Sequence, residues 1–248
     1  MPSRKHLAIY LREFHRLRHE HPKAFDVWQL ATFMPAWLRS LGGQASAFTD
    51  RIPWVTFPAL RFLTKTLHRD MRVFEYGSGG STFFFAERVR DLVSIEHDPT
   101  WAAKVEEALR VQCSNRPPVR LVEPESDADA AESDPADPDG YVSSDPSWRG
   151  WTFRRYAASI DGFAEAYFDL VFIDGRARPS CFKHSVAKVK PGGLLVVDNA
   201  ERPHYRHIHA SLEGPLWRKL DFAGPGPYNL YFWQTCAWQR LSASSGQP

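Results

Sequence analysis

A short apolar strand that runs into a glycine-rich turn constrains the fold of this chain more than any other feature. Residues 73–82 read Val-Phe-Glu-Tyr-Gly-Ser-Gly-Gly-Ser-Thr, with an acidic residue two positions before the first glycine. Glycine at positions 77 and 79 permits a tight turn and a close approach of a ligand to the backbone. A strand that leads into such a turn is typical of α/β sheets whose first turn holds a nucleotide.

Strand and helix patterns alternate from residue 72 onward. Apolar strands are expected at residues 73–76, 92–96, 119–123, 167–173 and 194–197, with helices between them. Such alternation predicts a parallel sheet with helices on both faces. Residues 217–222 and 229–238 read as two more strands, and the Gly-Pro-Gly-Pro loop between them predicts an antiparallel hairpin. The expected fold class is therefore α/β: a Rossmann-like, doubly wound, mostly parallel seven-stranded sheet with a C-terminal antiparallel hairpin and an N-terminal helical extension.

The chain divides into two expected parts. Residues 1–70 form the N-terminal helical extension, in which Leu7, Tyr10 and Phe14 recur at helical spacing. This extension either packs on the sheet or covers its ligand site. Residues 71–248 form the ligand-binding domain. Within it, residues 124–148 are rich in Asp, Pro and Ser, and we expect a flexible acidic insertion because they offer little apolar surface to bury.

Composition and charge exclude several classes of protein. A hydrophobic content of 43% supports a sizeable core, and no apolar run is long enough for a membrane span. Three widely spaced cysteines suit a reducing compartment, so we expect a cytoplasmic protein. The net charge is +2, but residues 121–148 hold nine acids and no Lys or Arg. The rest of the chain is therefore basic, which suits either an anionic substrate or an ordinary solvated surface. No nucleic-acid motif is present, and we expect no nucleic-acid partner.

The glycine turn departs from a dinucleotide-binding turn at two positions. Thr82 stands where that turn has Gly or Ala, and Glu75 stands where it has an apolar residue. A carboxylate at position 75 would repel a pyrophosphate. It suits a ligand with a cationic amino-acid part, such as S-adenosylmethionine.

A second acidic residue follows the second strand. Glu96 lies 19 residues after Gly77, where an acid can accept hydrogen bonds from both ribose hydroxyls. Asp98 competes with it for this role, although Asp98 before Pro99 also reads as a helix N-cap.

At this point the chain resembles the class I S-adenosylmethionine-dependent methyltransferases, from about residue 70 to the end. The resemblance rests on residues 75–79, 94–98, 168–175 and 190–199, in that order. Ser81 replaces a glycine that is frequent in that family, and the terminal hairpin matches the family's extra antiparallel strand. The resemblance implies that the cofactor-binding residues are Glu75, Gly77, Ser78, Gly79, Ser81, Thr82, Glu96, His97, Asp98 and Asp174.

The segments around residues 174 and 198 look like those of the cation-dependent O-methyltransferases, the group that includes catechol O-methyltransferase. In this resemblance Asp174, Asp198 and Asn199 would bind Mg²⁺, for which two carboxylates and an amide oxygen are suitable donors. The alternative is that both aspartates cap helices or hold loops. Ala177 stands where those enzymes carry a lysine base, which is a departure from the pattern.

The remaining polar residues near these segments supply candidates for catalysis and substrate binding. The candidate catalytic residues are Asp174, His204 and Tyr205, the last two of which are also consistent with surface or packing roles. The candidate substrate-binding residues are Arg176, Arg178 and Arg202, because guanidinium groups bind carboxylate, phosphate or sulfate. The segment from Gly175 to Cys181 also looks like an uncharacterised bacterial branch of the methyltransferases.

The sequence thus indicates an S-adenosylmethionine-dependent methyltransferase that methylates a hydroxyl group of a small or carbohydrate-like acceptor, with Mg²⁺ as an optional aid. Two alternatives remain: a nicotinamide-dependent oxidoreductase, and a non-catalytic scaffold protein that binds S-adenosylmethionine. The expected partner is a small-molecule or saccharide acceptor, and a homodimer is left open.

Overall fold

The central sheet has seven strands in the computed structural model, which describes residues 4–20, 27–112 and 117–242. Their spatial order is β3 (Val119–Leu121), β2 (Asp91–Glu96), β1 (Arg72–Tyr76), β6 (Phe168–Ile173), β7 (Val189–Val197), β9 (Trp233–Arg240) and β8 (Trp217–Gly224). The first five are parallel, whereas β9 is antiparallel to both β7 and β8. The predicted fold class is confirmed, including the terminal hairpin.

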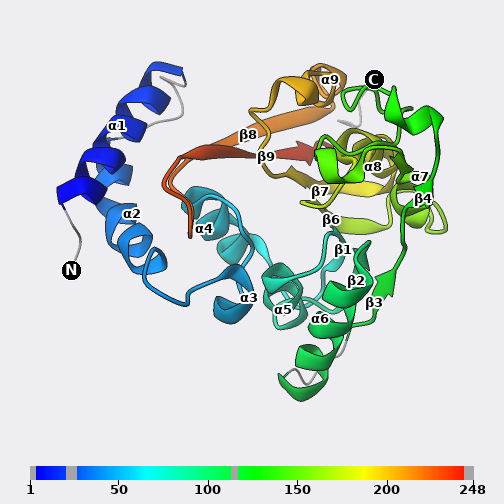
Figure 1. Ribbon diagram of the computed structural model, residues 1–248, viewed down its shortest axis with the longest axis horizontal. Coiled ribbons are helices and arrows are strands. Elements are labelled where there is room, and N and C mark those ends of the chain that lie inside the picture. The colour runs from blue at the N-terminus through cyan, green and yellow to red at the C-terminus, as the bar shows by residue number, and fades with distance from the viewer. Residues whose placement is uncertain (1–3, 21–26, 113–116, 243–248) are drawn as a thin grey trace, which may run out of the picture.

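Helices cover both faces of this sheet (Figure 1). The helices are α1 (Arg4–Glu20), α2 (Val27–Ser40), α3 (Ala47–Asp50), α4 (Phe57–Thr66), α5 (Gly80–Ala86), α6 (Pro99–Gln112), α7 (Arg154–Ala157), α8 (Arg178–Ser185) and α9 (Arg206–Ser211). Successive strand residues point to opposite faces. Val73 and Phe172 accordingly pack with residues of α4 and α5, while Phe74 and Ile173 pack with residues of α7, α8 and α9.

The N-terminal extension packs against the hairpin of β8 and β9. Tyr10 and Trp37 are fully buried in a cluster with Phe232, and the Trp37 indole donates a hydrogen bond to the carbonyl oxygen of Asn229 at 2.8 Å. Figure 1 shows α1 and α2 at one end of the molecule, where the tip of the hairpin reaches them. The extension then returns to the sheet through α3 and α4. Its division from the rest of the chain near residue 70 stays a prediction.

The acidic stretch from residue 124 to 148 carries short regular elements and long-range contacts, and its flexibility stays a prediction. It contains β4 (Glu125–Ser126), which pairs with β5 (Trp151–Thr152), and two short 3₁₀ turns, Asp129–Ala131 and Pro146–Trp148. Tyr141 and Val142 are buried, and the Tyr141 hydroxyl lies 3.1 Å from Nε2 of His184. Ion pairs from Asp139 to Lys183 and from Asp145 to Arg176 join this stretch to the basic body. Composition alone does not indicate these long-range contacts.

Three further 3₁₀ turns complete the described structure: Ala158–Ile160, Val186–Lys188 and Pro203–Tyr205. None of the helices in the described parts of the chain combines the length and apolar composition that a membrane span requires.

Candidate functional site

A cavity of about 870 Å³ opens at the carboxyl ends of β1, β2, β6 and β7. In α/β sheets, ligands bind beyond these strand ends. The lining includes Gly77, Ser78, Gly79, Ser81, Glu96, His97, Asp98, Asp174, Arg176, Arg178, Asp198, Asn199 and Arg202. The structure therefore gathers most of the predicted site residues into one space. Glu75 and Thr82 lie beneath it.

The turn at Gly77 requires glycine for two reasons. Its φ of +92° lies in the left-handed region, and a Cβ there would come within 2.9 Å of the Gly175 Cα. The Gly77 amide donates to the carbonyl oxygen of Ile95 at 2.9 Å, which closes the turn against β2. The loops after β1 and β6 can thus approach each other, and both line the cavity.

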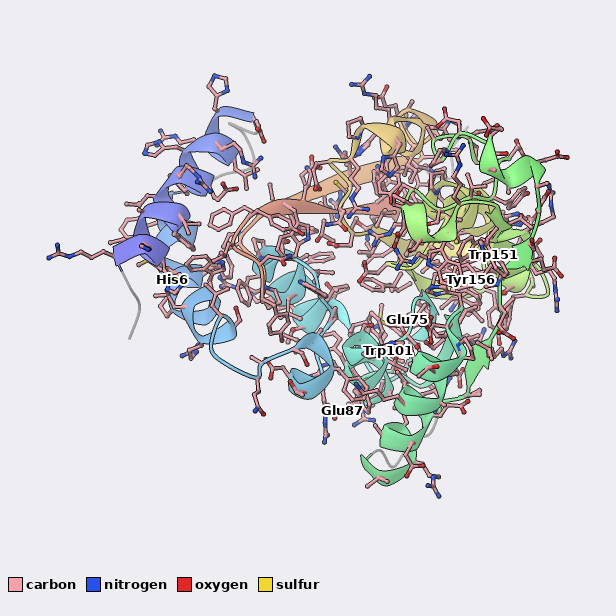
Figure 2. The ribbon with its side chains drawn as sticks, viewed as in Figure 1. His6, Glu75, Glu87, Trp101, Trp151 and Tyr156 are labelled. Carbon is pink, nitrogen blue, oxygen red and sulfur yellow. The ribbon has the colours of Figure 1, made fainter. Side chains whose placement is uncertain are left out.

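The Glu75 carboxylate supports the glycine turn from below. It is fully buried, and its Oε2 accepts hydrogen bonds from Thr82 Oγ1 at 2.8 Å and from Ser94 Oγ at 2.7 Å. Burial raises the pKa of Glu75 to about 7, although hydrogen bonds from Ser81, Ser94 and Thr82 counteract that rise. Figure 2 shows Glu75 near the centre of the molecule, close in the view to Trp101. In its ionised form, this carboxylate under the turn favours a cation in the cavity above it.

Glu96 is held by the backbone on both sides. Its Oε2 accepts from the amide and the hydroxyl group of Ser78, both at 2.9 Å. Its Oε1 accepts from the amides of His97 at 2.7 Å and Asp98 at 3.0 Å. Burial acts to raise the pKa of Glu96, but His97 and these hydrogen bonds hold it below its ordinary value. Of the four donors, only the Ser78 hydroxyl can rotate away to make room for a ligand hydroxyl.

Aromatic side chains border the same end of the cavity. Asp98 caps α6 by accepting a hydrogen bond from the Trp101 amide at 2.8 Å, so the predicted N-cap role is confirmed. The Trp101 indole donates to the Ser78 carbonyl oxygen at 2.8 Å, which ties α6 to the glycine turn. The rings of His97 and Trp148 meet edge to face with centroids 5.1 Å apart. These apolar walls suit a flat ring such as a purine.

The guanidinium of Arg178 is enclosed by five acceptors. Nε donates to the Gly175 carbonyl oxygen, and Nη2 donates to the carbonyl oxygen and the Oδ1 of Asp174, the latter at 2.8 Å. Nη1 donates to the Asp198 carbonyl oxygen and, at 3.4 Å, to Asn199 Oδ1. A guanidinium carries five N–H donors, and all five are used here. Arg178 therefore has no donor left for a substrate.

The Asp198 carboxyl group turns toward the hairpin. Its Oδ1 accepts from the Trp233 indole at 2.9 Å and from Thr235 Oγ1 at 2.5 Å. This follows from the sheet register, since Val197 pairs with Cys236 across β7 and β9 and places Asp198 beside Thr235. Burial, and next the charge of Asp174, raise the pKa of Asp198 to about 8. Burial also raises the pKa of Asp174, against the lowering effect of Arg178.

The fold is shared with solved methyltransferase structures. An O-methyltransferase from Bacillus cereus in complex with SAH is 14% identical, has a TM-score of 0.53, and matches over 95% of this chain and 100% of its own. The O-methyltransferase TomG from Streptomyces achromogenes, in complex with SAM, is 15% identical with a TM-score of 0.51. It matches over 98% of this chain and 92% of its own. The chain has the class I methyltransferase fold.

A methyltransferase from Geobacter sulfurreducens gives the same result for the fold. It is 15% identical with a TM-score of 0.51, over 85% of this chain and 97% of its own. No protein-family model and no curated protein matches the sequence. The sheet order of this methyltransferase fold places the glycine turn at the reversal point, between β1 and β6. That point is where ligands of open α/β sheets bind.

Within this methyltransferase fold, the predicted metal ligands do not form a metal site. Asp174 Oδ1 and Asn199 Oδ1 accept hydrogen bonds from Arg178. Asp198 Oδ1 accepts hydrogen bonds from Trp233 and Thr235. No group of three or more acidic, His or Cys side chains among the described residues is arranged to hold a metal ion. A fixed guanidinium occupies the place between these donors, so the residues do not fit Mg²⁺.

His204 and Tyr205 lie apart from the large cavity. They line a second, polar cavity of about 90 Å³, together with Ser143, Ser144, Arg176 and Arg202. Arg176 and Arg202 border both cavities. The large cavity has further walls that the sequence motifs do not include: Ser46 to Thr49 and Trp54 from the extension, and Asn229, Tyr231 and Trp233 from the hairpin. The expectation that the extension covers the site pointed to the first group, whereas no sequence motif pointed to the hairpin residues.

Proposed function

We propose that this protein is an S-adenosylmethionine-dependent O-methyltransferase that acts on a small or carbohydrate-like hydroxyl compound. One observation carries the proposal. A single cavity joins the glycine turn and Glu96 to the carboxyl groups of Asp174 and Asp198. It therefore offers a place for a donor beside groups that can handle the acceptor's proton.

The residues of the cavity fit a donor of this kind. Its amino-acid part, which is cationic, would lie over the turn at Gly77, above the buried Glu75. Its ribose would bind where the Ser78 hydroxyl now meets Glu96, with Asp98 as a second acceptor. Its adenine would lie against His97 and the neighbouring aromatic walls. These positions account for the unusual acid at residue 75 and for Glu96 and Asp98 at the end of β2 and just beyond it.

When bound, the cofactor supplies an electrophilic methyl group, and the chain must position the acceptor and take its proton. Asp198 is suited to take that proton, because its pKa of about 8 lies near neutral pH. Trp233 and Thr235 fix the orientation of its carboxyl group. Arg178 holds Asp174 at the neighbouring strand end, where it also donates to the Asp198 carbonyl oxygen. Asp174 is thus a positioning group, and Asp198 is the proposed base.

In this proposal no step requires Mg²⁺. The guanidinium of Arg178 provides the fixed positive charge between Asp174 and Asn199 that a cation would otherwise provide. Arginine stays charged at every relevant pH and has no proton to give. The predicted aid of Mg²⁺ is therefore replaced by a charge built into the chain.

Calorimetric titration with S-adenosylhomocysteine and, separately, with NAD⁺ tests the proposal. We expect S-adenosylhomocysteine to bind with micromolar affinity and to raise the melting temperature, because a ligand that binds only the folded state stabilises it. NAD⁺ should not bind. The reverse result would support the oxidoreductase alternative and overturn the proposal.

A transfer assay separates the enzyme from a scaffold protein. Labelled S-adenosylmethionine is incubated with a panel of phenols and sugars, and methylated products are counted. We expect turnover of at least one hydroxyl compound, and its loss in Asp198→Asn. Cofactor binding with no transfer to any member of the panel would favour the scaffold alternative.

A further inference from the structure

The small cavity between residues 142–144 and the 3₁₀ turn Pro203–Tyr205 is the strongest unexplained feature of the molecule. It lies beside the large cavity and shares Gly175, Arg176, Arg178 and Arg202 with it. Its volume of about 90 Å³ is too small for a cofactor but suits one compact polar group. We propose that this cavity binds an anionic group of the acceptor, a carboxylate, phosphate or sulfate, whose hydroxyl group then faces the donor.

The charges around this cavity favour an anion. Arg202 lines it, and among the described residues the Arg202 side chain makes neither a hydrogen bond nor an ion pair. Arg176 lines it as well, and its partner Asp145 lies 3.0 Å away in a partly exposed pair. Such pairs contribute little and can be exchanged for a ligand. Two guanidinium groups are therefore available, whereas Arg178 is fully bound to the protein.

A neutral donor completes the site. His204 lines the cavity, and its Nε2 is buried without a hydrogen-bond partner among the described residues. Burial, and next the charges of Arg202 and Arg178, lower the pKa of His204, so the ring is neutral at pH 7 and can carry its proton on Nε2. The hydroxyl groups of Ser143 and Ser144 offer further contacts. An anion in the cavity would satisfy the buried nitrogen that is now unpaired.

The backbone geometry beside the small cavity also supports an anion site. Ala177 has a φ of +45°, which is uncommon for a residue with a Cβ, and it lies between Arg176 and Arg178. This turn separates the two arginines, so that one is locked into the protein and the other borders both cavities. Strained backbone persists where the surrounding structure enforces it, and such positions cluster at ligand sites. The cavity also meets the N-terminus of α8, whose dipole adds positive potential.

This inference rests on the proposed function for the identity of the acceptor, but the anion site itself can be tested alone. The probe is inorganic sulfate, titrated calorimetrically into the full chain at low ionic strength. The variants are Arg202→Gln and, as a matched control, Arg206→Gln on the exposed side of α9. We expect Arg202→Gln to weaken sulfate binding at least tenfold, and Arg206→Gln to bind like the wild type.

The affinity for S-adenosylhomocysteine is measured on the same samples, and Arg206→Gln should bind it like the wild type. Equal sulfate affinity in all three proteins would overturn the inference. Sulfate binding without S-adenosylhomocysteine binding would instead overturn the proposed function and leave the anion site intact.

In the transfer assay, pairs of acceptors that differ only in one carboxylate, phosphate or sulfate group complete the test. We expect the anionic member to be preferred by the wild type, and the preference to fall in Arg202→Gln. Equal use of both members by the wild type would refute an anionic acceptor.

Discussion

Arg178 binds Asp174, four residues before it in the chain, with Nη2 donating to Oδ1 at 2.8 Å in a largely buried pair. The same guanidinium also spans to the residues that follow β7. One side chain therefore joins the ends of two neighbouring strands. In a metal-dependent enzyme a cation would make that connection.

The first prediction concerns metal removal. Because Arg178 already supplies the positive charge, excess EDTA should leave the rate of methyl transfer unchanged, and equilibrium dialysis should detect no bound Mg²⁺. Loss of activity in EDTA that Mg²⁺ restores would contradict this account.

The stability of an Arg178→Ala variant tests the same interaction without an acceptor. Removing one partner of a buried ion pair leaves the other charge uncompensated, so the free energy of unfolding should fall by about 3–5 kcal/mol. Urea denaturation measures it, with the exposed Arg206→Ala as the control. A loss equal to that of the control would show that the pair is not structural.

Much of this site follows from the sequence, and the reasons are local. Parallel strands bring their carboxyl ends to one edge, so Glu96, Asp174 and Asp198 could be assigned to one region before any geometry was known. The orientation of the Asp198 side chain could not be predicted, because it depends on the register between β7 and β9, which pairs residues far apart in the sequence. The locking of Arg178 depends on the left-handed turn at Ala177, for which an alanine gives no signal.

The second prediction distinguishes the contributions of Glu96 and Asp98 to cofactor binding. Glu96→Ala should weaken S-adenosylhomocysteine binding by about 1–3 kcal/mol, since a buried hydrogen-bonding group is lost. Asp98→Asn should have a smaller effect, because its cap on α6 survives through the amide oxygen. Calorimetry measures both dissociation constants, with the exposed Glu106→Ala as the control. A larger loss in Asp98→Asn would move the ribose contact to that residue.

The third prediction concerns the dependence of stability on pH. The pKa of Glu75 is about 7 in the folded protein and 4.5 ordinarily, so the folded state holds its proton over a pH range in which the unfolded state has lost it. Its contribution to stability is complete below about pH 4.5 and is lost as the pH rises to 7. The loss is about 3 kcal/mol.

Glu75→Gln cannot ionise and should not show this loss. Its free energy of unfolding, relative to the wild type, should therefore rise between pH 5 and pH 7.5. Urea denaturation at several pH values gives the comparison, and Glu106→Gln is the control. Parallel curves for wild type and Glu75→Gln would mean that Glu75 titrates in the ordinary range.

The fourth prediction concerns the proposed base. Asp198 accepts a proton only when ionised, so kcat/KM should rise about tenfold per pH unit below its pKa and level off above about 8. Asp198→Asn should lower the rate by about 10²- to 10⁴-fold and abolish the rise. A pH–rate profile of both proteins decides the matter. An unchanged profile in the variant would assign the proton to another group.

The contact between Gly80 and the extension has a consequence for how such a protein can change over time. A Cβ at Gly80 would lie 1.9 Å from the carbonyl oxygen of Ala47, and the residues around Ala47 border the large cavity. A replacement of the segment around Ala47 must therefore preserve the close packing of α3 on the start of α5, because only glycine at position 80 leaves room for the Ala47 carbonyl oxygen.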